Sequence, residues 1–210
     1  INISGGLLAS IDWRVPFFVF LAALVLVPMG ARSLPEPVVT AEAKATPRLK
    51  FREWPLAFIG LVYLMLFLVN IAFFFVPTQV PFYVRELGYD GAQIGGVALA
   101  SSSLGIALGS LLYHPIRSRV RQAASTFVPA AFLVVVGFGI VSMAETLTVV
   151  MPGLLLAGLG FGVINVNGIV WAMEGTPTNI RGRVVGGLTA SMMLGHFCSP
   201  LVSQPIAQAW

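Results

Sequence analysis

Long apolar stretches separated by short polar ones run along the chain of 210 residues. About 20 residues of helix are needed to cross a hydrocarbon core of about 30 Å, and each apolar stretch is close to that length. A helix in lipid also satisfies its backbone hydrogen bonds within itself, as a spanning segment must. The pattern therefore predicts six transmembrane helices. Their approximate ranges are 15–31, 54–79, 92–113, 123–144, 147–173 and 184–208.

The composition suits a protein embedded in lipid. Hydrophobic residues make up 57% of the chain and charged residues only 10%, whereas an ordinary soluble domain carries roughly a quarter charged residues. A water-soluble fold could not cover so large an apolar core. The sequence therefore predicts an all-α, multi-pass membrane protein.

Most basic residues lie on one side of the predicted topology. When the loops alternate between two sides, Arg14 and Arg85 fall on one side and the other lysines and arginines on the opposite side. Cytoplasmic loops collect basic residues, so we expect the basic side, including a short loop at 113–122, to face the cytoplasm. The net charge of +4 then reflects topology, and we expect no nucleic-acid partner. The residues on the basic side are Arg32, Lys44, Arg48, Lys50, Arg52, Arg117, Arg119, Arg121, Arg181 and Arg183.

Polar side chains occur at membrane depth in the second, fifth and sixth spans. Asn70 and Phe74 share a face of the second span, Asn167 and Trp171 share a face of the fifth, and His196 lies in the sixth. Polar groups at this depth are unfavourable unless they face protein or a water-filled cavity. We therefore expect these five residues to line a shared cavity and to contact the substrate.

Two of these residues allow two interpretations each. His196 has an unperturbed pKa of about 6.5 and is a candidate proton carrier or substrate hydrogen-bond partner; the alternative is a neutral histidine packed between helices. Trp171 either stacks on a substrate or packs in the core. Asn70 and Asn167 are stronger candidates for substrate contact, because an amide donates and accepts hydrogen bonds without bringing charge into lipid.

The third span carries a stripe of small residues at alternating steps of four and three, which places them on one helical face. Such a stripe predicts that another helix backbone approaches closely. Its members are Gly91, Gly95, Ala98, Ser102, Gly105 and Gly109.

Three segments carry a resemblance to a known family. They are "GGLLASIDWRVPFFVF" at 5–20, "GSLLYHPIRSRVR" at 109–121 and "EGTPTNIRGRVVGG" at 174–187. Their order and spacing resemble the major facilitator superfamily (MFS), twelve-helix secondary transporters built from two six-helix lobes. The first resembles the end of that family's fifth helix and its sixth. The second resembles the second-lobe copy of the loop motif G-x-x-x-D-R-x-G-R-R, and the third the loop before the eleventh helix.

The resemblance implies that the chain covers the family's sixth to eleventh helices. Residues 1–31 then hold the end of the first lobe with one transmembrane helix, 32–53 a cytoplasmic linker, and 54–210 a second-lobe bundle of five helices. We therefore expect a piece of a longer protein, with the rest of the first lobe and the last helix outside this chain. Tyr113 stands where the family motif has Asp, so the family's Asp-to-Arg locking pair is not available in this half.

Charged residues at the predicted cytoplasmic ends of the spans are candidates for conformational gating. Arg117 and Arg119 either only determine topology or pair with the end of a neighbouring helix in one transport state. Glu174 and Arg181 or Arg183 bracket the loop before the last span, where an ion pair is expected. A partly exposed pair of this kind stabilises by about 0 to 1 kcal/mol.

The sequence therefore predicts a secondary active transporter of the alternating-access type, exporting a neutral or amphipathic small molecule across a bacterial inner membrane. Its partners are the substrate, the bilayer, the first lobe and, as one candidate, a coupling proton. We expect no enzymatic activity and no cofactor. We also expect no metal site, because His114 and His196 lie far apart and neither has Cys, Asp or Glu at ligand spacing. Two alternatives remain open: a non-transporting scaffold or sensor, and a rhomboid-like intramembrane protease, although "ALASSSLGIA" lacks the G-x-S-x-G surround that a nucleophilic serine needs.

Overall fold

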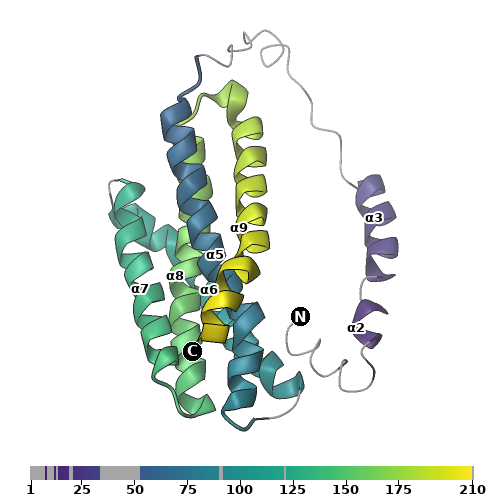
Figure 1. Cartoon of the computed structure of the whole chain (residues 1–210). Coiled ribbons are helices and arrows are strands. Elements are labelled where there is room, and N and C mark those ends of the chain that lie inside the picture. Colours follow the sequence, from purple (N-terminus) through teal and green to yellow (C-terminus); the bar gives the residue numbers. More distant parts are fainter. Residues whose placement is uncertain are drawn as a thin grey trace.

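A computed structural model describes Leu8, Asp12 and residues 14–18, 21–33, 53–89, 92–120 and 122–209. Regular structure in these ranges is helical throughout. Figure 1 shows α5 to α9 side by side as a bundle, with α2 and α3 apart from it. The elements are α2 (Val15–Phe18), α3 (Ala22–Ser33), α5 (Leu56–Glu86), α6 (Ala92–Arg119), α7 (Ala124–Ser142), α8 (Leu147–Glu174), the 3-10 turn η3 (Thr178–Ile180) and α9 (Arg181–Ala209).

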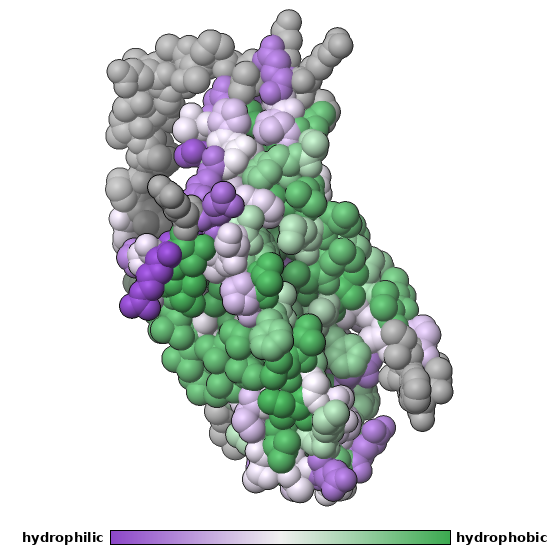
Figure 2. All heavy atoms as spheres, turned by 90° about the vertical axis from the view of Figure 1, so that its left-hand side faces the viewer, coloured by the Kyte–Doolittle hydropathy of each residue, from purple (hydrophilic) through white to green (hydrophobic). Residues whose placement is uncertain are grey.

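Within the described ranges, five helices are long and apolar enough to cross a membrane, and they correspond to the second to sixth predicted spans. The first predicted span, 15–31, is described only in part, as α2 and α3 with residues 19 and 20 outside the description. The predicted linker, 32–53, lies almost entirely outside the described residues. Figure 2 shows a broad hydrophobic surface across the middle of the molecule, with hydrophilic residues gathered toward its two ends.

Two predicted loops are largely helical. α5 continues to Glu86, and α6 continues through Pro115 to Arg119, so the loop expected at 113–122 is mostly the last turns of α6. Hydropathy marks where a helix leaves lipid and not where its backbone hydrogen bonding stops. A proline costs a membrane helix one backbone bond, which neighbouring groups can compensate. Side chains hold both extensions: the Tyr83 hydroxyl lies 2.6 Å from the Ala144 carbonyl, and Arg117 Nη1 donates to the Val120 carbonyl at 2.7 Å.

The α6–α8 contact confirms the prediction of a small-residue stripe. A Cβ atom added to Gly105 or Gly109 would collide with the α8 carbonyls of Leu155 and Leu159. The stripe is not uniform, since Gly95, near the other end of α6, faces Pro81 of α5. Small residues therefore let α6 approach α8 to backbone distance, as membrane helices commonly do.

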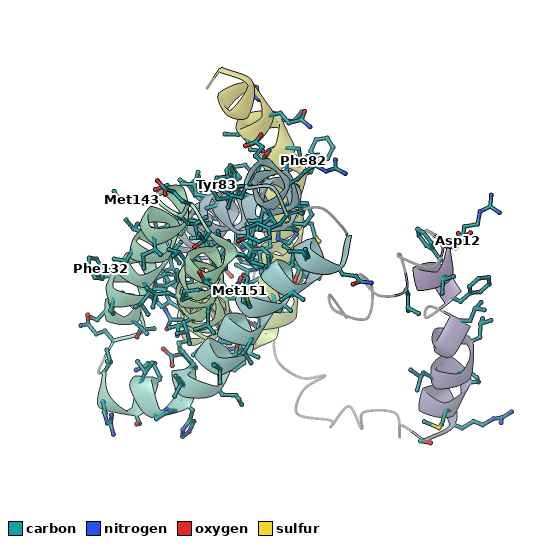
Figure 3. All side chains as sticks on the ribbon, turned by 90° about the horizontal axis from the view of Figure 1, so that it is seen from below. Asp12, Phe82, Tyr83, Phe132, Met143 and Met151 are labelled. Carbon is teal, nitrogen blue, oxygen red and sulfur yellow. The ribbon has the colours of Figure 1, made fainter. Side chains whose placement is uncertain are left out.

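The helix α7 packs against α8 by one face and exposes the other. Phe127 and Ala130 are buried on the inner face, whereas Val128 and Phe132 are exposed on the outer one. Figure 3 shows Phe132 projecting away from the bundle. Since an apolar face of this kind needs no protein partner in lipid, α7 has the character of a rim helix, as its nearly uniform hydrophobicity predicts.

Candidate functional site

Asn70 of α5 and His196 of α9 form a hydrogen bond of 2.9 Å at membrane depth. Asn70 Nδ2 donates to the Leu66 carbonyl at 2.8 Å, which leaves Oδ1 to face the imidazole. An amide oxygen only accepts, so the network assigns the proton of this bond to His196 Nε2. A neutral His196 then carries its lone pair on Nδ1, and no described residue is hydrogen-bonded to that atom.

Two aromatic rings of α5 enclose this imidazole. Phe74 stacks on His196 with ring centroids 4.8 Å apart and an interplanar angle of 22°, and Phe73 lies 5.6 Å away. The helices come this close because Gly195 has no side chain: a Cβ there would collide with the Phe67 carbonyl of α5. We call Asn70, Phe73, Phe74 and His196 the His196 cluster.

Asn167 and Trp171 lie elsewhere, in a second cluster toward the end of the bundle that carries Arg117. The Tyr113 hydroxyl of α6 donates to Asn167 Oδ1 at 3.1 Å, and Asn167 Nδ2 donates to the Ala123 carbonyl at 3.0 Å. Trp171 packs edge-on to Phe58, with ring centroids 5.3 Å apart. The structure thus divides the five predicted substrate residues into two groups, because Asn167 points to the side of α8 that faces α6 and the start of α7.

Glu174 at the end of α8 pairs with Arg117 of α6, with both carboxylate oxygens within 3.1 Å of Nη2. The expected pair between Glu174 and Arg181 or Arg183 is therefore wrong. Arg181 Nε donates instead to the Thr176 carbonyl, in the turn before its own helix. The parallel packing of α6 and α8 brings their last turns together and favours Arg117 as the partner. Arg119, two residues further along α6, is exposed.

A family comparison decides what kind of protein carries these features. The model of the Major Facilitator Superfamily matches residues 2–200 of the chain. The chain belongs to the Major Facilitator Superfamily. Neither a curated protein nor a solved structure matches it. Family membership confirms the resemblance read from the motifs and agrees with the all-α membrane fold, and it supports a multi-pass membrane transporter of small molecules.

At the motif position where this superfamily has Asp, the chain therefore uses a neutral contact. Tyr113 binds Asn167 of α8, and one turn later Arg117 binds Glu174. These two contacts join the same ends of α6 and α8. Where the resemblance to the family motif implies an Asp-to-Arg pair, this chain has a hydrogen bond from a phenol to an amide and, one turn later, an ion pair.

Asn165 is a polar residue of α8 that the sequence reasoning passed over. Its side chain is half-buried, Nδ2 donates to the Phe161 carbonyl at 3.0 Å, and Oδ1 is buried with no hydrogen-bond partner in the described structure. Asn165 and Asn167 lie about 200° apart around the helix. The motif "INVNG" could have flagged both, but periodicity alone does not tell which of the two faces the interior of the transporter.

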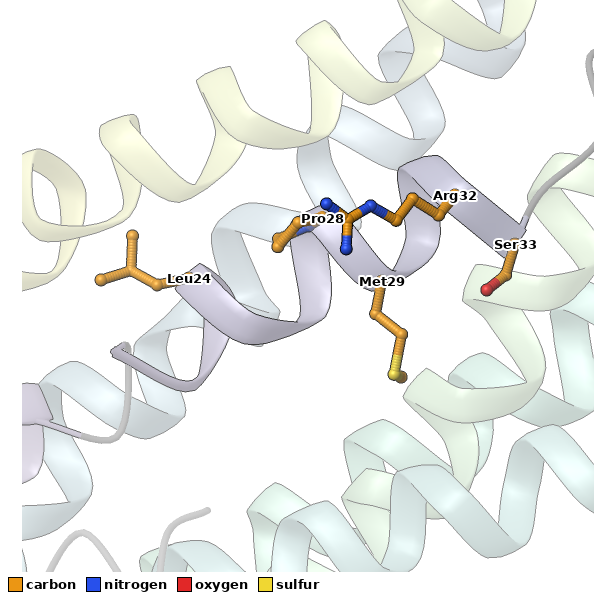
Figure 4. Close-up of a pocket in the computed structure, with 5 residues that line it drawn as sticks. All are labelled: Leu24, Pro28, Met29, Arg32 and Ser33. Carbon is orange, nitrogen blue, oxygen red and sulfur yellow. The ribbon is translucent and has the colours of Figure 1, made fainter.

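A pocket along α3 lies outside this arrangement. Figure 4 shows its lining side chains, none of which belongs to either cluster. They are Leu24, Pro28, Met29, Arg32 and Ser33. Because they all come from one helix, the pocket is a surface feature of α3, and it brings together none of the predicted site residues.

Proposed function

We propose that this MFS chain belongs to a secondary active transporter that exports a neutral or amphipathic small molecule by alternating access. The His196 cluster is the observation that carries the proposal. It places an imidazole and an amide between α5 and α9 at the depth where transporters of this kind bind substrate. The bundle α5–α9 is then the second lobe, which rocks against a first lobe of the same protein, with residues 32–53 as the cytoplasmic linker.

The chemistry of the cluster supports an uncharged substrate. Phe73 and Phe74 offer aromatic faces beside an imidazole whose Nδ1 can accept a hydrogen bond. Residues 56–84 contain no lysine or arginine, and residues 182–209 contain only Arg183, at the beginning of α9. The cluster therefore has no cation that could pair with an anionic group. We retain Phe74 and His196 as the substrate contacts and assign Asn70 to holding the imidazole, because its side chain is fully buried and its amide is bonded to Leu66 and His196. Asn167 and Trp171 are assigned to packing at the Arg117 end.

The Arg117–Glu174 pair supports a gating role for the ends of α6 and α8. The pair is formed here at 3.0 Å, and in this proposal it forms in one transport state and opens in the other. Arg119 and Arg181 then contribute to topology, with this end of the bundle in the cytoplasm.

Export of an uncharged fluorescent probe, 7-amino-4-methylcoumarin, tests the proposal. Cells that produce the intact protein should lose the probe faster than cells without it. His196→Gln should slow export about threefold to tenfold, the range expected when one hydrogen bond to the substrate is lost. The matched control is His114→Gln, which changes the exposed histidine of α6 and should leave export unchanged.

Equal export by His196→Gln and wild type, with equal amounts of protein in the membrane, would leave His196 as a packing residue. The same assay across pH 5 to 8 tests proton coupling, since an imidazole that carries the proton gives a pH profile that His196→Gln removes. A protein that is correctly inserted but moves no probe at any pH would support the scaffold or sensor alternative.

A further inference from the structure

The side-chain amide of Asn165 is held in one orientation. Its partner, the Phe161 carbonyl, can only accept, so the nitrogen must face that carbonyl. The oxygen is thereby directed away from the helix backbone. This Oδ1 is buried and has no partner among the described residues, although buried polar atoms in proteins are nearly always paired.

Asn165 occupies the sector of α8 between α5 and α6. On one side, the Phe161 ring contacts Phe73 of α5, with centroids 5.3 Å apart, and Gly168 faces Leu66 of α5. Phe161 lies one helical turn before Asn165 on α8, and Gly168 lies one turn after it.

On the other side, glycines of α8 face α6. A Cβ on Gly158 or Gly162 would collide with the carbonyls of Ser102 and Ile106. This sector does not close completely, because Ile169, one turn after Asn165, is 37% exposed. Asn165 is itself half-buried, so it lies at the margin of the α5–α8 packing and not inside a sealed core.

The same contacts set the depth of Asn165. α5 and α8 run antiparallel, with Phe161 opposite Phe73 and Gly168 opposite Leu66. Asn165 lies midway between Phe161 and Gly168, and Asn70 lies midway between Leu66 and Phe73. The unpaired oxygen is thus at the level of the Asn70–His196 bond.

We propose that Asn165 Oδ1 accepts a hydrogen bond from a hydroxyl or N–H group of the substrate, and that this acceptor selects donor-bearing molecules within the uncharged class. The inference rests on the proposed function. A site that hydrogen-bonds its substrate rejects an analogue lacking the group, because the buried polar atom is then left unpaired. Asn165 is therefore a specificity-determining residue in addition to the His196 cluster.

Cysteine labelling tests the location without any substrate. The intact protein is prepared with its native cysteines replaced, including Cys198, the single cysteine of this sequence. Asn165→Cys and Ala172→Cys are then exposed to N-ethylmaleimide in detergent. Ala172 is fully buried on the same helix and is a small residue, so its replacement is a mild control. We expect labelling at position 165 to be at least tenfold faster, and equal rates would overturn the inference.

Binding of two neutral coumarins tests the selectivity. 7-Amino-4-methylcoumarin has N–H donors, and 7-dimethylamino-4-methylcoumarin has none. Calorimetric titration of the wild-type protein should give a Kd about threefold to tenfold lower for the amino compound, the range for one neutral hydrogen bond. Asn165→Leu should bring the two Kd values within twofold of each other.

The outcomes separate this inference from the proposed function. A preference that survives in Asn165→Leu would overturn the role of Asn165 while leaving a transporter of uncharged molecules in place. Equal wild-type affinities would also overturn it and would assign Oδ1 to a bound water. Absence of binding of both coumarins to the wild type would count against the proposed function, and the labelling rates alone would then decide the position of Asn165.

Discussion

The α6–α8 pair and the α5–α9 pair hold their helices together in different ways. Across α6–α8 the contact is backbone against backbone, and the glycines alternate between the partners. Gly105 and Gly109 of α6 face carbonyls of α8, and Gly158 and Gly162 of α8 face carbonyls of α6. Along these glycines the backbones touch directly, so this part of the interface has no side chains that could rearrange, and side chains join the two helices nearer their ends, through Tyr113–Asn167 and Arg117–Glu174.

Across α5–α9 several polar side chains form hydrogen bonds between the helices. The Tyr63 hydroxyl donates to the Val184 carbonyl at 2.7 Å, and Ser191 donates back to the Tyr63 carbonyl at 2.8 Å. Further along, Gln79 Nε2 donates to Ser203 Oγ at 2.9 Å. Together with the Asn70–His196 bond, these contacts can exchange partners as the helices shift. The polar groups proposed to contact a substrate are accordingly His196 of α9, held by Asn70 of α5, and Asn165 of α8.

A bulky residue at the α6–α8 contact should have the most severe consequence. In Gly162→Val the new side chain meets the Ile106 carbonyl, and the backbones must separate to accept it. Overpacking of a tight contact costs about 1–3 kcal/mol, and we expect the upper end of that range. Thermal unfolding of the detergent-purified protein measures the loss. Gly139→Val is the matched control, because nothing lies near a Cβ at that position of α7; equal unfolding temperatures for the two variants would contradict the close backbone contact of α6 and α8.

Loss of the amide that joins α6, α7 and α8 should have an intermediate effect. Asn167→Leu leaves the Tyr113 hydroxyl and the Ala123 carbonyl without this partner, at a cost of about 1–3 kcal/mol for unpaired buried groups. Asn165→Leu is the control. It removes an oxygen that has no described partner and a hydrogen bond to the Phe161 carbonyl, which keeps its helix backbone bond, so the unfolding free energy should change by about 0.5 kcal/mol or less. A larger loss in Asn165→Leu than in Asn167→Leu would reverse the roles assigned to the two residues.

The sequence predicts the spans and the small-residue stripe because both depend on composition and helical period. Gly105 and Gly109 can be placed on one face without knowing the partner helix. The sequence does not say that the stripe meets Gly158 and Gly162, because the partner's rotation about its axis depends on the whole bundle.

Side-chain partners also depend on the whole bundle and not on the local sequence. Asn165 and Asn167 are equally polar, and only the positions of α5, α6 and α7 decide that Asn167 is tied to α6 and the start of α7. Sequence proximity favours Arg181 for Glu174, but Arg117 reaches it from a parallel neighbour. The family motif predicts that charge gathers at this end, and it does not predict which residues pair.

The Arg117–Glu174 pair should contribute least to stability, although it joins the same two helices. The Arg117 side chain is 24% exposed and the Glu174 side chain 49% exposed, so water screens much of the attraction, and such pairs contribute about 0 to 1 kcal/mol. Arg117→Ala should therefore lower the unfolding free energy by less than about 1 kcal/mol. Its effect on export should be larger, because an ion pair that forms in one state and opens in the other shifts the balance between them. The double variant Arg117→Glu with Glu174→Arg should recover export that either single charge reversal loses, and Arg119→Ala should behave like wild type in the same coumarin assay. If Arg119→Ala and Arg117→Ala reduce export equally, the positive charge of the α6 end matters and the pair does not.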